Sequence, residues 1–448
     1  MRSSRSMLFL VFLGALLWGG ARSAAQKSYA QAPEASRKLI EIKVTGSKRF
    51  PAEAIATATG LPLGMIATED DFKKGAQRLG DLGVFTDIAY DFSFSSAGTK
   101  LQYRVTDADK FVPARFEDFV WFTDAELRRR IQQNAPLFDG SLPVSGGLID
   151  QVSDVLQAML VENHIPGHVE FHRERQGEEG PVQDIVFQVA DVEIRVRNFE
   201  FPGAGESELP ALEAAARNFV PRQYSRTKLD AFAQRQFLPV YHQRGYLKAT
   251  FSEPQPKVVK DSSDQSDDAS RNLQIVDVSF TVTPGQQFKV KSINWTGNKE
   301  FPTEQLAKMV RLQPGDIANS VLLSDNLQDV QKLYGSRGYV TATIRVAADY
   351  DYTESTAALR LEINEGPVYH MGELEFRGLD NSLTAKLRSL WKIRSGEVFD
   401  STYLSDYLPK AQKLLPTNFD WDVSSHVTAN TRDKTVDVDL IYTVKAPK

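Results

Sequence analysis

Apolar and polar positions along the chain predict one order of elements that recurs five times. Each copy begins with a strand-like apolar run, at residues 39–44, 116–121, 194–201, 289–295 and 371–376. A first helix follows, then a turn that contains glycine in four of the five copies. A second helix and two closing strands complete each copy. The pattern therefore predicts a β-α-α-β-β unit of about 80 residues, repeated from residue 38 to residue 445.

Individual residues repeat as well as elements. Gly46-Ser47-Lys48-Arg49-Phe50-Pro51 corresponds to Gly297-Asn298-Lys299-Glu300-Phe301-Pro302, and the same offset aligns Leu61 with Leu312. The second helix of two copies ends in nearly identical form, at Arg244-Gly245-Tyr246 and Arg337-Gly338-Tyr339. We interpret these glycines and aromatics as structural, with Tyr246 and Tyr339 packing against the core of their own copy.

The predicted fold class is α+β, with tandem modules that each place two helices on one face of a three-stranded mixed sheet. A right-handed crossover puts the third strand beside the first, so the second strand becomes an exposed edge. We expect a signal peptide at 1–25 and modules 1 to 5 at 37–109, 110–191, 192–285, 286–367 and 368–446.

The first 25 residues have the features of an export signal. Arg2 and Arg5 precede an apolar run at 7–18, and small residues follow at 21–25. An uncleaved membrane anchor is the alternative. The chain has no cysteine, and an exported protein of several domains without disulfides fits a bacterial periplasm. No later apolar run reaches the roughly 20 residues that a membrane-spanning helix needs.

The repeat resembles the POTRA domain (polypeptide-transport-associated). The resemblance rests on the opening at 297–301, its twin at 46–50, the two Arg-Gly-Tyr segments and the exit Glu365-Gly366-Pro367. The array is similar to the periplasmic part of outer-membrane assembly factors of the BamA type. Such proteins usually carry a membrane β-barrel after the last POTRA domain, whereas here the final strand at 436–444 is followed by Lys448. The resemblance therefore implies client handling and docking, with a separate β-barrel protein as an expected partner, or a relative without a barrel and with a task of its own.

The function that we expect is binding of extended peptides by β-augmentation, because an edge strand offers unpaired backbone groups to a partner. Expected clients are unfolded outer-membrane proteins, and other envelope assembly proteins or peripheral association with the outer membrane are further expectations. Each edge could instead be covered by a neighbouring loop or module. A docking or spacer subunit of a secretion or cell-envelope complex is the alternative function. The candidate edge residues are Ile88, Tyr90, Phe92, Val169, Phe171, Leu247, Phe251, Val340, Ile344, Val423 and Val427.

Catalytic chemistry is not indicated, and we predict no enzyme activity, no cofactor and no metal. His164, His168 and His172 have a spacing of four, but Pro166 and Gly167 interrupt any helix that would bring the three rings together. The acidic stretch 260–268 has no apolar residue and is predicted to form a hairpin tip, with a cation-binding loop as the less favoured alternative. A net charge of −5 without a basic cluster argues against nucleic-acid binding.

Overall fold

The structure, a computed structural model, describes residues 29–178, 180–259 and 272–444. The predicted signal peptide and the acidic stretch 260–268 lie outside the described residues. Along the described chain, no helix combines the length and the apolar character needed to cross a bilayer. The chain divides into two compact units, and the division runs through module 3. The first unit is Met1–Asn198, Pro221–Lys228 and Pro256–Val278, and the second is Phe199–Val220, Leu229–Gln255 and Ser279–Lys448.

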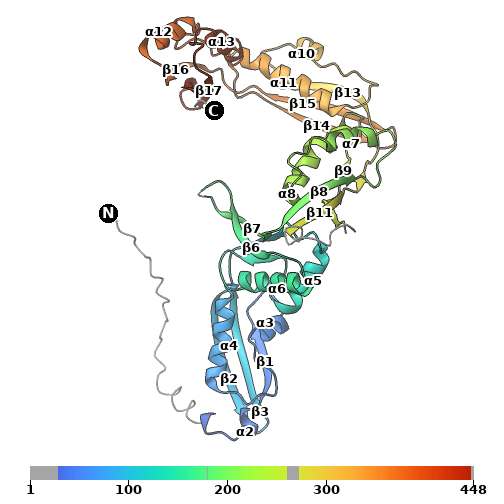
Figure 1. Cartoon of the computed structure of the whole chain (residues 1–448), viewed down its shortest axis with the longest axis vertical. Coiled ribbons are helices and arrows are strands. Elements are labelled where there is room, and N and C mark those ends of the chain that lie inside the picture. The colour runs from blue at the N-terminus through green and yellow to red at the C-terminus, as the bar shows by residue number, and fades with distance from the viewer. Residues whose placement is uncertain (1–28, 179, 260–271, 445–448) are drawn as a thin grey trace. The chain divides into compact units, whose positions relative to one another are not determined.

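Module 1 shows the predicted arrangement of two helices against one face of a three-stranded sheet (Figure 1). The sheet order is β1-β3-β2, with β1 parallel and β2 antiparallel to the central β3. Thr68 begins the second helix, because its hydroxyl accepts a hydrogen bond from the Asp71 N–H while the Asp71 carboxylate accepts one from the Thr68 N–H. The elements are α2 (Glu34–Arg37), β1 (Leu39–Thr45), α3 (Ala52–Ala58), α4 (Glu69–Asp81), β2 (Phe85–Ser95) and β3 (Gly98–Asp107).

Module 2 has a four-stranded sheet in the order β5-β4-β7-β6. Its opening strand ends at Phe116, so the predicted strand at 116–121 is wrong. Phe119 and Val120 are buried in the turn after the strand, and burial in a turn gives the same apolar run as burial in a strand. The elements are β4 (Phe111–Phe116), α5 (Asp124–Asn134), β5 (Ser141–Pro143), α6 (Leu148–Glu162), β6 (His168–Arg175) and β7 (Val182–Ala190).

Module 3 departs most from the pattern. Its second helix passes through a π-helical turn that ends at Phe237, two residues before Pro239, which has no N–H to continue the α-helical hydrogen bonds. Its strands form a sheet in the order β10-β11-β8 and a separate pair, β12-β9. The elements are β8 (Glu193–Glu200), α7 (Leu209–Ala216), α8 (Arg226–Phe232), η1 (Ala233–Phe237), α9 (Leu238–His242), β9 (Thr250–Phe251), β10 (Gln255–Val258), β11 (Leu273–Ser279) and β12 (Val282–Thr283).

Modules 4 and 5 return to the three-stranded pattern, with orders β13-β15-β14 and β16-β18-β17. In both, the first strand is parallel and the second antiparallel to the central third strand. The tandem β-α-α-β-β fold of the α+β class is thereby confirmed. The elements are β13 (Lys289–Thr296), α10 (Thr303–Met309), α11 (Ser320–Ser336), β14 (Thr343–Asp351), β15 (Thr356–Asn364), β16 (His370–Arg377), α12 (Asn381–Leu390), α13 (Tyr403–Gln412), β17 (Trp421–Asn430) and β18 (Thr435–Val444).

The repeated Gly-x-Lys-x-Phe segment has a structural role in module 4. Gly297 has φ +83°, and the N–H groups of Lys299 and Glu300 both donate to the Glu365 carboxylate, at 2.6 and 2.8 Å. Phe301 is buried and its ring lies 4.9 Å from that of Tyr334. The segment therefore holds the residues that follow the first strand against the end of the third strand.

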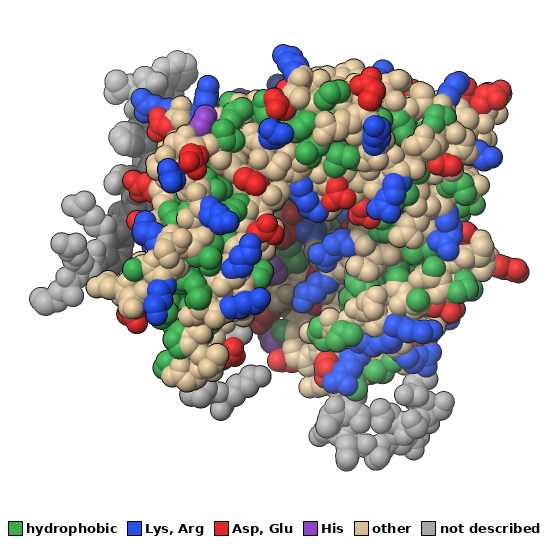
Figure 2. Space-filling model, turned by 90° about the horizontal axis from the view of Figure 1, so that it is seen from above, with side chains coloured by type: hydrophobic (Ala, Val, Ile, Leu, Met, Phe, Trp, Pro, Cys, Tyr) green, Lys and Arg blue, Asp and Glu red, His purple; other side chains and the backbone are tan. Residues whose placement is uncertain are grey.

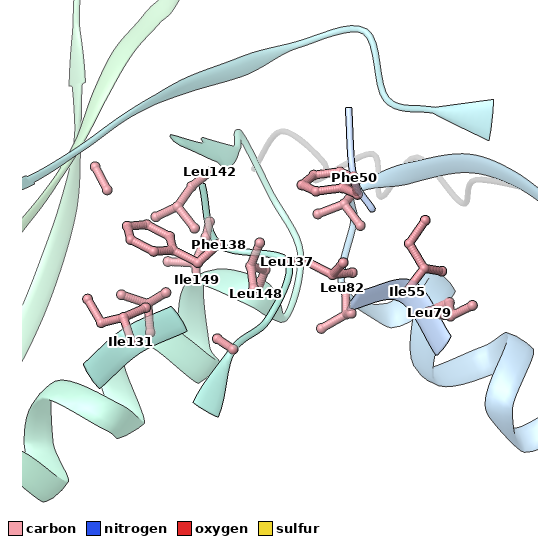
Figure 3. Packing of buried hydrophobic residues seen from close by; sticks show 14 of the residues in the cluster. Phe50, Ile55, Leu79, Leu82, Ile131, Leu137, Phe138, Leu142, Leu148 and Ile149 are labelled. Carbon is pink, nitrogen blue, oxygen red and sulfur yellow. The ribbon is translucent and has the colours of Figure 1, made fainter. Parts of the chain in front are cut away.

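One continuous apolar core joins modules 1 and 2 within the first unit. Figure 3 shows Phe50 and Leu82 of module 1 facing Leu137 and Leu148 of module 2. The backbone supports this contact, because the N–H of Leu148 donates to the carbonyl oxygen of Leu82 at 3.3 Å. The two modules are therefore packed as one body.

Polar contacts connect module 2 to the part of module 3 that lies in the first unit. The Glu117 carboxylate accepts hydrogen bonds from the Ser225 hydroxyl at 2.6 Å and from the N–H and hydroxyl of Thr227 at 2.9 and 2.8 Å. Arg226 pairs with Asp124 at 2.7 Å. A carboxylate of one module thus caps the first turn of a helix in the next.

Beside this contact, burial and then the negative charge of Glu117 raise the pKa of Asp118 to about 7, although Lys228 and Arg226 act in the opposite direction. An unfolded aspartate titrates near 3.8, so between about pH 4 and pH 7 the folded state holds a proton that the unfolded state has lost. Stability around α8 should therefore fall as pH rises through this window. We expect a loss of about 2 kcal/mol in the free energy of unfolding. This is less than the full pKa shift would give, because water partly screens the Asp118 carboxylate. Amide exchange gives the free energy of opening of α8 at each pH and so measures this loss. In the D118N variant this free energy should not change across the window.

Candidate functional site

Edge strands lie where the sequence predicts them in four of the five modules. The second strands β2, β6, β14 and β17 are each the last strand of their sheet. The candidate residues on them recur at alternate positions and thus share a face of their strand. All of these residues are half-buried except Val427, whose exposed fraction is 47%. The candidate residues on these four strands are Ile88, Tyr90 and Phe92, Val169 and Phe171, Ile344, and Val423 and Val427.

Leu247 and Val340 are not in edge strands, so the prediction that they are edge residues is wrong. Both lie in turns, and the strands that follow begin only at Thr250 and Thr343. Leu247 packs against a core cluster of module 4, and Val340 against that of module 5. Each side chain therefore joins its module to the next, which explains its apolar character without an edge strand.

Phe251 lies on β9, which has only two residues and pairs with β12. The edge of the main sheet of module 3 is β10 instead. The Phe251 ring packs in an aromatic cluster, 5.9 Å from Phe237 and 5.7 Å from Tyr241. In module 3, the predicted edge residue is thus part of the core packing.

Module 4 has a cavity beside an edge strand, between β14 and the start of α11. We call it the β14 pocket, and its volume is about 190 Å³. Three of the side chains that line it are buried, with exposed fractions of 3 to 5%: Leu312, Leu323 and Leu359. The remaining lining residues are Leu247, Ala318, Asn319, Ser320, Val346, Ala348 and Tyr350.

The strand side of the β14 pocket consists of Val346, Ala348 and Tyr350, which alternate along β14 and face the helix. Val346 is the most exposed of them, at 44%. Because β14 is an edge strand, a polypeptide paired with it would run past the opening of this pocket. The arrangement provides backbone pairing and one apolar side-chain site together.

Charged groups surround the C-terminal end of β14. The Lys248 ammonium lies 4.5 Å from the centre of the Tyr350 ring, a cation–π distance. Backbone N–H donation from Glu354, followed by Lys291, keeps the pKa of Asp351 below its usual value. Asp349 pairs with Arg360 at 3.3 Å. Both signs of charge thus flank the edge. Figure 2 likewise shows Lys and Arg interspersed with Asp and Glu over most of the face it displays.

Ala348 and Tyr350 are not among the edge residues predicted from the sequence, which in this strand named only Ile344. The strand continues to Asp351. The alternation of Val346, Ala348 and Tyr350 is the signal that would have extended it. The signal is weak because alanine is only slightly apolar, and the small Ala348 side chain leaves the pocket open.

The three histidines do not form a metal site. Among the described residues there is no group of three or more His, Asp or Glu side chains that could hold a metal ion. His168 lies between Glu170 and Asp191, at 3.0 and 2.9 Å, and the hydrogen bond to Glu170 raises its pKa. These are contacts of an exposed side chain at the start of β6.

Comparison with known proteins matches one of these modules to the POTRA domain. Residues 288–366 match the family model of the POTRA domain, described as a surface antigen variable number repeat. This range contains module 4 and the β14 pocket. The resemblance to the POTRA family stated from the sequence is thereby confirmed.

The relatives found include a putative outer membrane protein assembly factor of Treponema pallidum, 27% identical over 168 residues. That match covers 38% of this chain and 19% of the relative, so the chain spans about a fifth of the relative's length. Similar solved structures include BamA POTRA3-5 of Haemophilus influenzae, with TM-score 0.44 and 19% identity over 57% of this chain and 97% of that one. Omp85 POTRA1-3 of Anabaena gives TM-score 0.26 and 17% identity, over 57% of this chain and 96% of that one.

Proposed function

We propose that this chain is a periplasmic scaffold that binds extended segments of unfolded outer-membrane proteins, or of assembly partners, by β-augmentation. Partners of this kind include a separate β-barrel protein and other envelope assembly proteins. The Treponema pallidum relative, named as a putative outer membrane protein assembly factor, supports the assembly role. The predicted export signal supports the periplasmic location.

The observation that carries the proposal is the β14 pocket beside an unpaired strand edge. Backbone pairing binds many sequences, because every residue except proline offers the same N–H and C=O groups. A pocket on the same edge adds affinity for an apolar side chain at one position. Such a site suits clients that share an extended, alternating pattern rather than one exact sequence.

Hydrogen–deuterium exchange of the full chain tests the proposal. The probe is a blocked synthetic peptide of alternating apolar and polar residues that stays extended in solution. At about ten times its Kd, the peptide should slow exchange of β14 amides roughly tenfold, since only the peptide-free fraction exchanges. Amides of β15, already paired on both sides, should change little. If no edge strand is protected at saturating peptide, the proposed binding function fails and a docking or spacer role takes its place.

A further inference from the structure

The groove of module 1 that corresponds to the β14 pocket is filled by a side chain of the protein itself. Tyr29 is only 2% exposed, although it precedes the first strand. Its ring centre lies 4.8 Å from that of Phe92, 5.1 Å from Phe94 and 6.0 Å from Phe72. Its hydroxyl donates to the carbonyl oxygen of Ala67 at 3.2 Å and lies 3.0 Å from the Thr99 hydroxyl.

The strand pairing fixes the correspondence between the two modules. Leu101 pairs with both Ile42 and Phe92, and Leu359 pairs with both Ile293 and Ala348. On the helix side, Ala67 and Ala318 each directly precede the residue that caps the second helix. Four of the residues around Tyr29 are Ala67, Phe72, Phe92 and Phe94, and their counterparts in module 4 are Ala318, Leu323, Ala348 and Tyr350.

All four counterparts line the β14 pocket. The largest difference between the two sets is Ala348 in place of Phe92, which removes one ring from the strand side. The volume of about 190 Å³ is sufficient for an aromatic ring, since a cavity of roughly 150 Å³ lined by apolar side chains holds benzene. Module 4 therefore has an open pocket at the place where module 1 holds a tyrosine.

We propose that the β14 pocket is an aromatic side-chain site, which takes a tyrosine or phenylalanine from the extended segment paired with β14. This inference rests on the proposed function and specifies its ligand. The Ala318 carbonyl can accept a hydrogen bond from a phenol, as that of Ala67 does from Tyr29. The Thr99 hydroxyl has no counterpart, because Ala357 occupies the equivalent position in the strand pairing. Tyrosine and phenylalanine should therefore bind similarly.

The test uses the full chain and four blocked peptides that are identical except for one central residue, which is Tyr, Phe, Leu or Ala. We expect the Tyr and Phe peptides to bind within about threefold of each other and at least tenfold more tightly than the Ala peptide. The Leu peptide should be at least threefold weaker than either. Calorimetry gives the Kd values, and amide exchange identifies β14 as the protected strand.

Two variants localise the site. A348F restores the ring that module 1 carries at this position, so it should weaken the Tyr peptide at least tenfold. A347F places the same ring on the neighbouring residue of β14, which faces the other side of the strand, and should change the Kd less than twofold. Exchange protection of β15 reports whether each variant is folded. The peptide series needs no variant and decides the question if A348F does not fold.

The outcomes separate the two proposals. Equal protection of β14 by all four peptides would leave β-augmentation in place and overturn the aromatic site. Aromatic preference with protection of another strand would also overturn it. Protection by none of the peptides would instead overturn the proposed function.

Discussion

Replacing Gly297 with valine should lower the local stability of module 4 by about 3 kcal/mol. A Cβ added at Gly297 would lie 2.1 Å from the carbonyl oxygen of Ile363, and the φ of +83° is unfavourable for a β-branched residue. The backbone of β15 has to move to admit the side chain. Hydrogen exchange of β13 and β15 in the full chain measures the loss, because the two strands pair along their length.

Gly315 of the same module is the matched control. Its φ is +94°, but no atom lies within 4 Å of an added Cβ. Gly315→Val therefore adds backbone strain without the clash and should cost about 1–2 kcal/mol. Equal losses in the two variants would show that the close approach to Ile363 does not determine the stability of the module.

The close approach at Gly297 recurs in other modules and gives the repeated glycine a physical meaning. An added Cβ would lie 2.1 Å from the Val105 carbonyl at Gly46 and 1.9 Å from the Tyr442 carbonyl at Gly378. In each case the first strand ends against the end of the third. The repeated glycine thus allows the chain after the first strand to pack against the end of the third strand.

The sequence predicted the element order because that order follows from local periodicity. Alternation marks the strands, the 3.6-residue period marks the helices, and glycine marks the turns. Tyr339 illustrates this success, since its ring lies 5.9 Å from that of Tyr334 within the core of module 4, as expected. The edge position of the second strand followed from the handedness of the crossover.

Contacts between modules could not be predicted in this way. Leu247 and Val340 have the apolar character of strand residues, but each packs on the following module. The β14 pocket depends on a small residue, Ala348, at a position where module 1 has Phe92. A small side chain in place of a large one and a contact between modules leave no periodic signal in the sequence. Both follow only from the three-dimensional structure.

The continuous core of modules 1 and 2 leads to the second large effect. Leu82→Ala should destabilise both modules by about 3 kcal/mol, since removing a buried leucine side chain leaves a cavity. Leu82 is 5% exposed and faces Leu137 and Leu148 across the contact between the modules (Figure 3). Hydrogen exchange of the full chain should show faster exchange in α4 of module 1 and in α6 of module 2.

Leu415→Ala is the matched control, because Leu415 has the same side chain and the same exposed fraction of 5%. It belongs to the core cluster of module 5, which otherwise contains only residues of that module and Val340. Its effect should stay within module 5, with β18 exchanging faster and β15 unchanged. Loss of protection confined to module 1 in the Leu82 variant would show that modules 1 and 2 unfold independently, despite the apolar contact between them.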